Sequence, residues 1–271
     1  MMISLKNISV KFNPRSVDEI DALKDVNLEI QEREFVTFIG TNGSGKSTLL
    51  NVIAGSIFPD DGQVVIDGKD VTRLPAHRRA FMLSRVFQNP FMSTAPDMSI
   101  AENLLMAWFR GRKRYPGFSL NKKLMAFFSE RLLELEMGLE GRLNNAAGTL
   151  SGGQRQAITL LMAVLIKPKI LLLDEHTAAL DPKTAAQVSK LTKKFISSGN
   201  LTTLMVTHSM KQALEMGNRI IMLHRGQIIS DIPAKEKEQL TVEDLLGKFD
   251  NIRKKEKLTP EMLTGFRRQY A

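Results

Sequence analysis

Residues 40 to 47 carry the pattern G-x-x-x-x-G-K-[ST], which is typical of a loop that binds phosphate groups. Its glycines allow tight turns and a close approach to phosphate oxygens, and its successive N–H groups can form an anion-binding nest. We expect Lys46 to reach the β- and γ-phosphates of a nucleotide and the Ser47 hydroxyl to bind Mg²⁺. The candidate binding residues of this loop are Gly40, Thr41, Asn42, Gly43, Ser44, Gly45, Lys46, Ser47 and Thr48.

Two adjacent carboxylates, Asp174 and Glu175, follow the continuous apolar segment 170–173. Such a segment is typical of a strand buried on both faces, and ligands bind at the carboxyl edge of open α/β sheets. Successive side chains on a strand point to opposite faces, so these two carboxylates can have different roles. The alternative is a solvated strand end, but the strand and the other motifs favour a functional pair.

The segment 150–156 reads Leu-Ser-Gly-Gly-Gln-Arg-Gln and precedes an apolar-periodic helix. Ser151 and Gln154 have the spacing of a capping box, which is a structural explanation for both residues. That explanation leaves out Gly152 and Gly153, because glycine is a poor helix former. Two glycines at a helix start predict that another group must approach the backbone closely.

Four more residues lie where buried segments end or where an aromatic ring could stack. Gln88 follows the expected strand 84–87, and His208 follows the expected strand 202–206. Asp181 lies in the sequence Ala-Ala-Leu-Asp, and Phe12 belongs to the N-terminal strands. A lone histidine is more often structural, and the alternative for Phe12 is a core residue of the N-terminal strands.

The hydrophobic pattern predicts an α/β fold. Alternation over 3–5, 8–10 and 26–30 indicates an N-terminal antiparallel β subdomain, whereas the apolar runs 35–39, 170–173 and 202–206 indicate buried parallel strands. Helices are expected at 47–54 and 151–166, and segments 220–223 and 228–229 flank a hairpin turn. Helical patterns at 100–108 and 120–137 indicate an inserted α-helical subdomain at about 89–165. We therefore expect a P-loop NTPase core with a mostly parallel sheet over 1–235 and a charged helical C-terminal extension over 236–271.

Composition and charge limit the class of protein. The chain has 271 residues, 43% of them hydrophobic and 25% charged, with no cysteine, so disulfides and thiolate metal sites are excluded. No apolar run reaches the roughly 18 residues of a membrane span, and residues 1–12 do not resemble a secretion signal. The net charge is +9, with basic clusters at 108–123 and 248–271. These clusters are expected to be solvated surface or to contact anionic lipid headgroups, and nucleic acid is not expected as a partner.

Taken together and in this order, the motifs resemble those of the ATPase subunit of an ATP-binding cassette (ABC) transporter. The resemblance covers roughly residues 2 to 235. It implies that Asp174 binds Mg²⁺ through water and that Glu175 orients and deprotonates the attacking water. It also implies that Gln88 contacts Mg²⁺ and water and links the core to the helical subdomain.

The same resemblance implies roles for the remaining candidates. His208 would contact the γ-phosphate, Asp181 would cross a dimer interface, and Phe12 would stack on adenine. The γ-phosphate held by one subunit would be contacted by the signature segment of the opposite subunit, through Ser151, Gly152, Gly153 and Gln154. One departure is His176, because family members often carry proline after the catalytic glutamate. His77 and His224 are expected at the surface.

The resemblance further implies partners and a location. ATP and Mg²⁺ would lie between two copies of the chain, which would be peripheral at the cytoplasmic face of the membrane. Membrane-spanning permease subunits and an extracellular substrate-binding protein would complete an importer, with an amino-acid-like solute as one candidate. The alternative is a soluble ABC ATPase of iron–sulfur cluster assembly, which also fits the length of the chain.

Overall fold

The computed structural model describes residues 1–14, 16–111 and 120–255. Arg112, Lys113 and Arg114 of the first basic cluster lie outside the described residues, as does the segment 256–271 of the second. The chain forms two compact units, one made of Met1–Arg73 with Leu204–Ala271 and the other of Leu74–Thr203. Among the described residues, none of the helices combines the length and apolar character needed to cross a bilayer.

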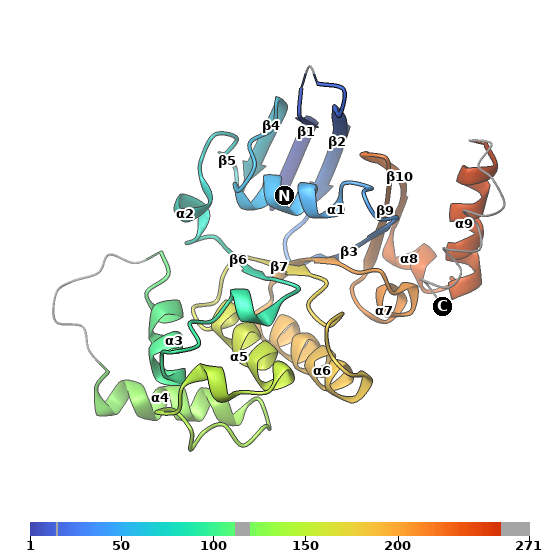
Figure 1. The fold of residues 1–271 in the computed structure, drawn as a ribbon. Coiled ribbons are helices and arrows are strands. Elements are labelled where there is room, and N and C mark those ends of the chain that lie inside the picture. Colours follow the sequence, from blue (N-terminus) through green and yellow to red (C-terminus); the bar gives the residue numbers. More distant parts are fainter. Residues whose placement is uncertain (15, 112–119, 256–271) are drawn as a thin grey trace. The chain divides into compact units, whose positions relative to one another are not determined.

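An antiparallel sheet opens the first unit. Its strands are β1 (Ile3–Phe12), β2 (Ile20–Ile30), β4 (Asp61–Ile66) and β5 (Lys69–Asp70), in the order β2-β1-β4-β5 (Figure 1). The predicted antiparallel N-terminus is thus confirmed, but segments 3–5 and 8–10 belong to one strand. The pairing of β1 shifts register between Leu5 and Ile8, where Asn7 has a φ of 53°. This bulge explains the interruption of the alternating pattern.

The first unit also contains the strand that leads into the phosphate-binding loop. Strand β3 (Phe35–Gly40) runs parallel to β9 (Arg219–His224), which pairs antiparallel with β10 (Gln227–Ile232). Helix α1 (Lys46–Ala54) contacts both β2 and β3. Strand β8 (Thr202–Val206) crosses the boundary between the two units and leads to α7 (Met210–Glu215).

The segment after residue 235 contributes to the core of the first unit. It forms α8 (Ala234–Lys237) and α9 (Val242–Lys255). Leu245 and Phe249 of α9 belong to the same buried cluster as Ile39 of β3. Lys237 is also buried, and its Nζ donates hydrogen bonds of 2.6 Å to the carbonyl oxygens of Met216 and Gly217. The cluster therefore connects this segment to the strand that ends at Gly40.

The second unit combines a parallel strand pair with helices. Strands β6 (Leu83–Val86) and β7 (Ile170–Asp174) are parallel, with Val86 opposite Leu173. The helices and 3₁₀ turns are α2 (Ala76–Arg79), η1 (Pro90–Met92), α3 (Ile100–Trp108), α4 (Lys122–Leu133), η2 (Ala147–Thr149), α5 (Gly152–Val164) and α6 (Pro182–Gly199). Helix α5 contacts α3, α4, α6, β6 and η1, so it is the central element of this unit (Figure 1).

Arg110 is a basic residue with a structural role. Its Nη2 donates a 2.8 Å hydrogen bond to the carbonyl oxygen of Ala163, near the C-terminus of α5. Burial lowers the pKa of its guanidinium to about 10, so the group remains charged at neutral pH. A cation at a helix C-terminus is favourable because the last carbonyls lack intrahelical partners.

Candidate nucleotide-binding site

The phosphate-binding loop has the backbone geometry that its glycines predict. Gly43 and Gly45 have φ values of 73° and 99°, in the region that residues with a side chain rarely adopt. A Cβ on Gly45 would lie 2.5 Å from the carbonyl oxygen of Ala22 in β2. The close packing of the loop against β2 therefore requires glycine at position 45.

Lys46 begins α1 and places its charge within the loop. Its side chain is buried, and its Nζ donates to the carbonyl oxygens of Gly40 at 2.7 Å and Thr41 at 2.9 Å. The N-terminal N–H groups of α1 and the helix dipole favour an anion at the same place. The loop thus combines a fixed cation with backbone donors, which suits a polyphosphate.

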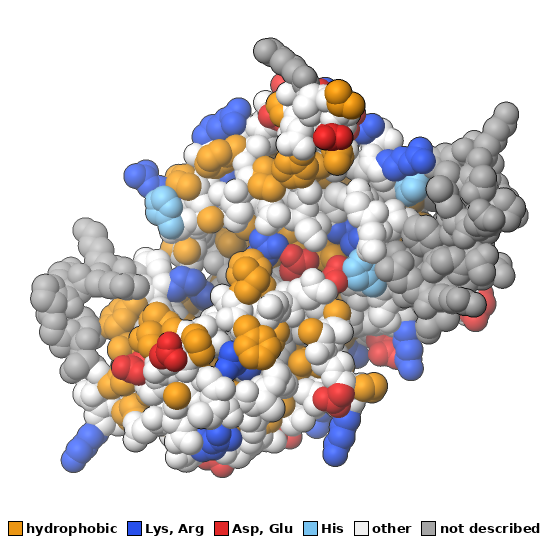
Figure 2. All heavy atoms as spheres, in the orientation of Figure 1, with side chains coloured by type: hydrophobic (Ala, Val, Ile, Leu, Met, Phe, Trp, Pro, Cys, Tyr) orange, Lys and Arg blue, Asp and Glu red, His pale blue; other side chains and the backbone are white. Residues whose placement is uncertain are grey.

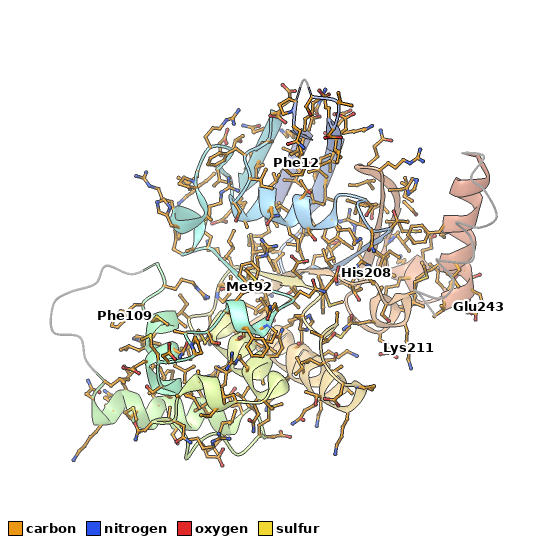
Figure 3. All side chains as sticks on the ribbon, in the orientation of Figure 1. Phe12, Met92, Phe109, His208, Lys211 and Glu243 are labelled. Carbon is orange, nitrogen blue, oxygen red and sulfur yellow. The ribbon has the colours of Figure 1, made fainter. Side chains whose placement is uncertain are left out.

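The loop that holds His208, which Figure 3 labels, is also in the first unit. It follows β8 and precedes α7. Its backbone is fixed on both sides. Thr207 N donates to the carbonyl oxygen of Phe38 in β3, at 3.1 Å, and Ser209 N donates to Thr207 Oγ1 at 3.1 Å. The first of these bonds joins the His208 loop to the strand that ends in the phosphate-binding loop.

Phe12 lies at the end of β1, opposite Ile20 of β2 (Figure 3). Its side chain is 39% exposed, so the interpretation as a core phenylalanine is wrong. An exposed ring on the loop-bearing unit remains available for stacking. The predicted contact with adenine stays a prediction.

The carboxylate pair of the second unit has an unusual backbone. Strand β7 ends at Asp174, and Glu175 follows with a φ of 45°. For a residue with a Cβ this conformation costs roughly 1–2 kcal/mol, and such residues cluster at functional sites. Ala178 N donates to the carbonyl oxygen of Glu175 at 2.9 Å, closing a turn that supports the strained backbone.

Asp174 is paired within its own unit. Its Oδ2 accepts a 2.6 Å hydrogen bond from Nη2 of Arg85 on β6, and both side chains are largely buried. The predicted magnesium ligands Ser47, Gln88 and Asp174 supply a hydroxyl, an amide and a carboxylate oxygen. Hard oxygen donors of this kind fit Mg²⁺, which is usually held by one or two carboxylates, water and phosphate.

Gln88 follows β6 and precedes the 3₁₀ turn η1. The side chain of Asn89 accepts a 2.9 Å hydrogen bond from Phe91 N, which fixes the start of this turn. The guanidinium of Arg155 lies over the ring of Phe91, 4.3 Å from its centroid. The segment after Gln88 is therefore attached to α5, the helix that begins at the signature segment.

The signature segment forms the predicted capping box. Ser151 Oγ accepts from Gln154 N at 3.3 Å, and Gln154 Oε1 accepts from Ser151 N at 3.2 Å. A Cβ on Gly153 would lie 2.1 Å from Thr184 Cγ2 of α6, whereas one on Gly152 would meet no described atom within 4 Å. Gly153 is thus explained by packing inside the chain, and only Gly152 presents an open backbone to an external group.

The residue after Glu175 is held by α5. Gln156 Nε2 donates a 2.6 Å hydrogen bond to the carbonyl oxygen of His176. The imidazole of His176 is buried, with Nε2 3.0 Å from Thr192 Oγ1. Since the Thr192 hydroxyl donates to the Val188 carbonyl at 2.8 Å, its oxygen accepts from the histidine, which assigns the proton to Nε2. His176 is therefore a structural residue.

Asp181 has a local function in addition to its predicted one. It is the N-cap of α6, and its carboxylate accepts a 3.1 Å hydrogen bond from Thr184 N. Hydrogen bonding to the Thr184 side chain, followed by the bond from Thr184 N, lowers the pKa of Asp181. Since Gly153 packs against Thr184, the signature segment and the Asp181 turn lie together within the second unit.

Sequence reasoning missed four residues that support the site: Arg85, Arg155, Gln156 and Thr184. Only Arg85 had a visible signal, as the one charged residue in the expected strand 84–87. The basic side chains of the described residues do not form a single patch on the face shown in Figure 2. There, lysine and arginine side chains are interspersed with acidic and hydrophobic ones.

Comparison with known proteins decides the family. The sequence model of the ABC transporter family matches residues 23–178 of this chain. The chain belongs to the ABC transporter family. The tyrosine transport ATP-binding protein of Clostridioides difficile (strain R20291) is 45% identical over 251 residues, which cover 92% of this chain and 99% of the relative.

Two further relatives support the same conclusion. The spermidine/putrescine import ATP-binding protein of Spiroplasma citri is 35% identical over 84% of this chain, which spans only 60% of that longer protein. The dimeric ATP-binding cassette MJ0796, in a post-hydrolysis state with ADP and Pi, has a TM-score of 0.73 and 33% identity. It covers 86% of this chain, and 99% of its own length is matched. The predicted α/β fold with a mostly parallel sheet, an antiparallel sheet and helices is thereby confirmed.

The two signature glycines of this ABC cassette give a matched pair of substitutions. We expect Gly153→Ala to destabilise the domain by about 1–3 kcal/mol, because the new methyl group would overlap Thr184. Gly152→Ala should cause no loss, because its Cβ meets nothing nearby and alanine is the better helix former. Urea unfolding of both variants would test this, and equal effects would contradict it.

The buried imidazole of His176 predicts a pH-dependent stability. Burial lowers its pKa to about 4, so between about pH 6.5 and pH 4 the unfolded chain binds a proton that the folded chain does not. Stability therefore falls as the pH falls through this window, and His176 should account for about 2 kcal/mol between pH 7 and pH 5. Urea unfolding at both pH values should show that loss in the native chain and in His77→Leu, which alters an exposed histidine, but not in His176→Leu. The same pH dependence in all three proteins would refute the role of His176.

Proposed function

We propose that this protein binds and hydrolyses ATP to drive solute import through separate membrane subunits. The observation that carries the proposal is the loop between β3 and α1. It holds the Lys46 ammonium next to the N-terminus of α1, and this combination of a cation with helix N–H groups supports binding of a triphosphate.

The hydrolytic step needs little covalent chemistry from the protein. Phosphoryl transfer to water depends mainly on positioning and on stabilising charge around the γ-phosphate. We assign Lys46 and His208 to the γ-phosphate, and Glu175 to orienting the water and accepting its proton. Ser47, Gln88 and Asp174 would hold Mg²⁺, which would supply positive charge to the triphosphate.

A second copy of the chain would complete the site. Ser151 and the open backbone at Gly152 suit contact with a γ-phosphate bound to the opposite subunit, because no described atom of the same chain lies near a Cβ at Gly152. The dimeric state of MJ0796 supports this arrangement. ATP would favour the closed dimer, and hydrolysis would release it, as a ligand-driven shift between two states.

The movement would reach the membrane through the segment after Gln88. Phe91 and Met92 in this segment are 58% and 74% exposed, and Arg155 stacks on Phe91. We propose that permease subunits bind here, so that the chain is peripheral at the cytoplasmic face of the membrane.

A substrate-binding protein would deliver the solute, for which an amino acid is the first candidate, given the 45% identity with a tyrosine transport protein. None of the relatives reported above is named as a protein of iron–sulfur cluster assembly, so they give no support to that alternative.

A mixing experiment would test the shared site. A Lys46→Ala chain and a Gly152→Asp chain should each be inactive, because every site of either homodimer lacks one component. Mixed together, they should regain ATPase activity, since a heterodimer contains one site with an intact loop and an intact signature segment. As a control, the Lys46→Ala chain should gain nothing from the Lys46→Ala/Gly152→Asp double variant. If the first mixture stayed as inactive as the second, the shared site would be wrong.

The role of Glu175 is tested by an isosteric substitution. Glu175→Gln should leave ATP binding intact and reduce turnover by about 10²–10⁴-fold, the usual contribution of general base catalysis. Steady-state hydrolysis and binding of radiolabelled ATP would measure the two effects. Glu29→Gln provides a control at an exposed position on β2. Turnover at the native rate would show that another group is the base.

A further inference from the structure

Arg85 is an unusual residue for its position. It lies on β6, between Ser84 and Val86, which are both buried, and its own side chain is 12% exposed. Removing a guanidinium from water is costly, and a buried ion pair is often no more stabilising than apolar residues of similar size. Stability alone therefore does not explain an arginine here.

Strand register explains what Arg85 contacts. Arg85 pairs with Leu172, and side chains two residues apart on a strand share a face. Arg85 therefore shares a face with Asp174, and its Nη2 lies 2.6 Å from Asp174 Oδ2. The guanidinium also lies over the Phe87 ring, 4.6 Å from its centroid. The positive charge is thus held beside both Asp174 and the residue that precedes Gln88.

We propose that Arg85 is a counter-charge that competes with Mg²⁺ for Asp174 and so sets the magnesium dependence of nucleotide binding. This inference rests on the proposed role of Asp174 as a magnesium-binding residue. The guanidinium and the hydrated cation are attracted by the same carboxylate, and two cations within a few ångströms repel each other. Stacking on Phe87 gives the guanidinium a second partner when Asp174 binds the metal.

The pairing also affects nucleotide that carries no metal. An unneutralised Asp174 would repel the triphosphate, which is itself strongly anionic. With Arg85 present, the pair has no net charge, so this repulsion is reduced. Arg85 should therefore strengthen the binding of metal-free nucleotide. Nucleotide binding should then depend less on the presence of Mg²⁺.

The test uses a substitution that removes the charge but keeps a polar side chain. For Arg85→Gln, the Mg²⁺ concentration that half-saturates binding of a non-hydrolysable ATP analogue should fall about three- to tenfold, as for the loss of one partly screened charge pair. Binding of the same analogue in EDTA should weaken by a similar factor. Equilibrium dialysis measures both quantities without any turnover.

Three variants make the result specific. Arg85→Lys keeps the charge and should remain near the native protein. Arg131→Gln, which removes an arginine of α4 that is paired with Glu134, should change neither quantity. In an Asp174→Asn background, Arg85→Gln should have no further effect on the magnesium dependence. An unchanged or increased Mg²⁺ requirement in Arg85→Gln would overturn the proposal, because an arginine that merely orients Asp174 predicts the increase. If Asp174→Asn itself left the magnesium dependence unaltered, the proposed metal role of Asp174 would fail instead.

Discussion

The contact between Gly153 and Thr184 is the constraint on which the arrangement of the signature segment, Asp181 and the backbone after Glu175 depends. A Cβ at position 153 would lie 2.1 Å from the Thr184 methyl group, so any larger residue would force the Thr184 side chain or the starts of α5 and α6 to shift. Thr184 N is bonded to the Asp181 carboxylate, and Gln156, in the first turns of α5, holds the carbonyl of His176. Three motifs that are separated in sequence are therefore fixed relative to one another by the first two turns of one helix. A shift of α5 would move the signature segment together with the backbone that follows Glu175.

Much of the fold could be predicted because buried parallel strands are continuous apolar runs. The runs 35–39, 170–173 and 202–206 correspond to β3, β7 and β8 within one residue at either end. Helix α6 was missed, although Asp181 and Pro182 form an N-cap and first-turn proline signal. Its lysine-, serine- and threonine-rich surface obscures the buried positions Val188, Leu191 and Phe195, which recur at helical spacing.

The site could be predicted only where a motif specifies its own chemistry. Lys46 lies inside the glycine-rich loop, and Ser151 forms the predicted capping box with Gln154. Both arrangements involve residues that are close in the chain, so the local sequence is enough to predict them. The glycine at 153 was attributed to an external group, since its neighbour Thr184 lies on a different helix. His224 was predicted at the surface, but it is the last residue of β9 and is buried, so that prediction is wrong. Contacts of this kind depend on pairing across the fold, which local patterns do not record.

A common principle connects the charged groups of the site. The Lys46 ammonium is bonded to loop carbonyls, the Asp174 carboxylate to Arg85, and the His176 imidazole is neutral and bonded to Thr192. Each group thereby avoids the large cost of an isolated charge in a buried place. Mg²⁺ and a triphosphate would bring opposite charges to the same two groups, an anion to Lys46 and a cation to Asp174. In that exchange Asp174 and Lys46 would each keep a partner of opposite charge, whereas Arg85 would lose its carboxylate and keep the stacking contact with Phe87. The free energy of ligand binding in the proposed cycle therefore depends on the internal partners that are given up, Arg85 among them, as well as on the motif residues.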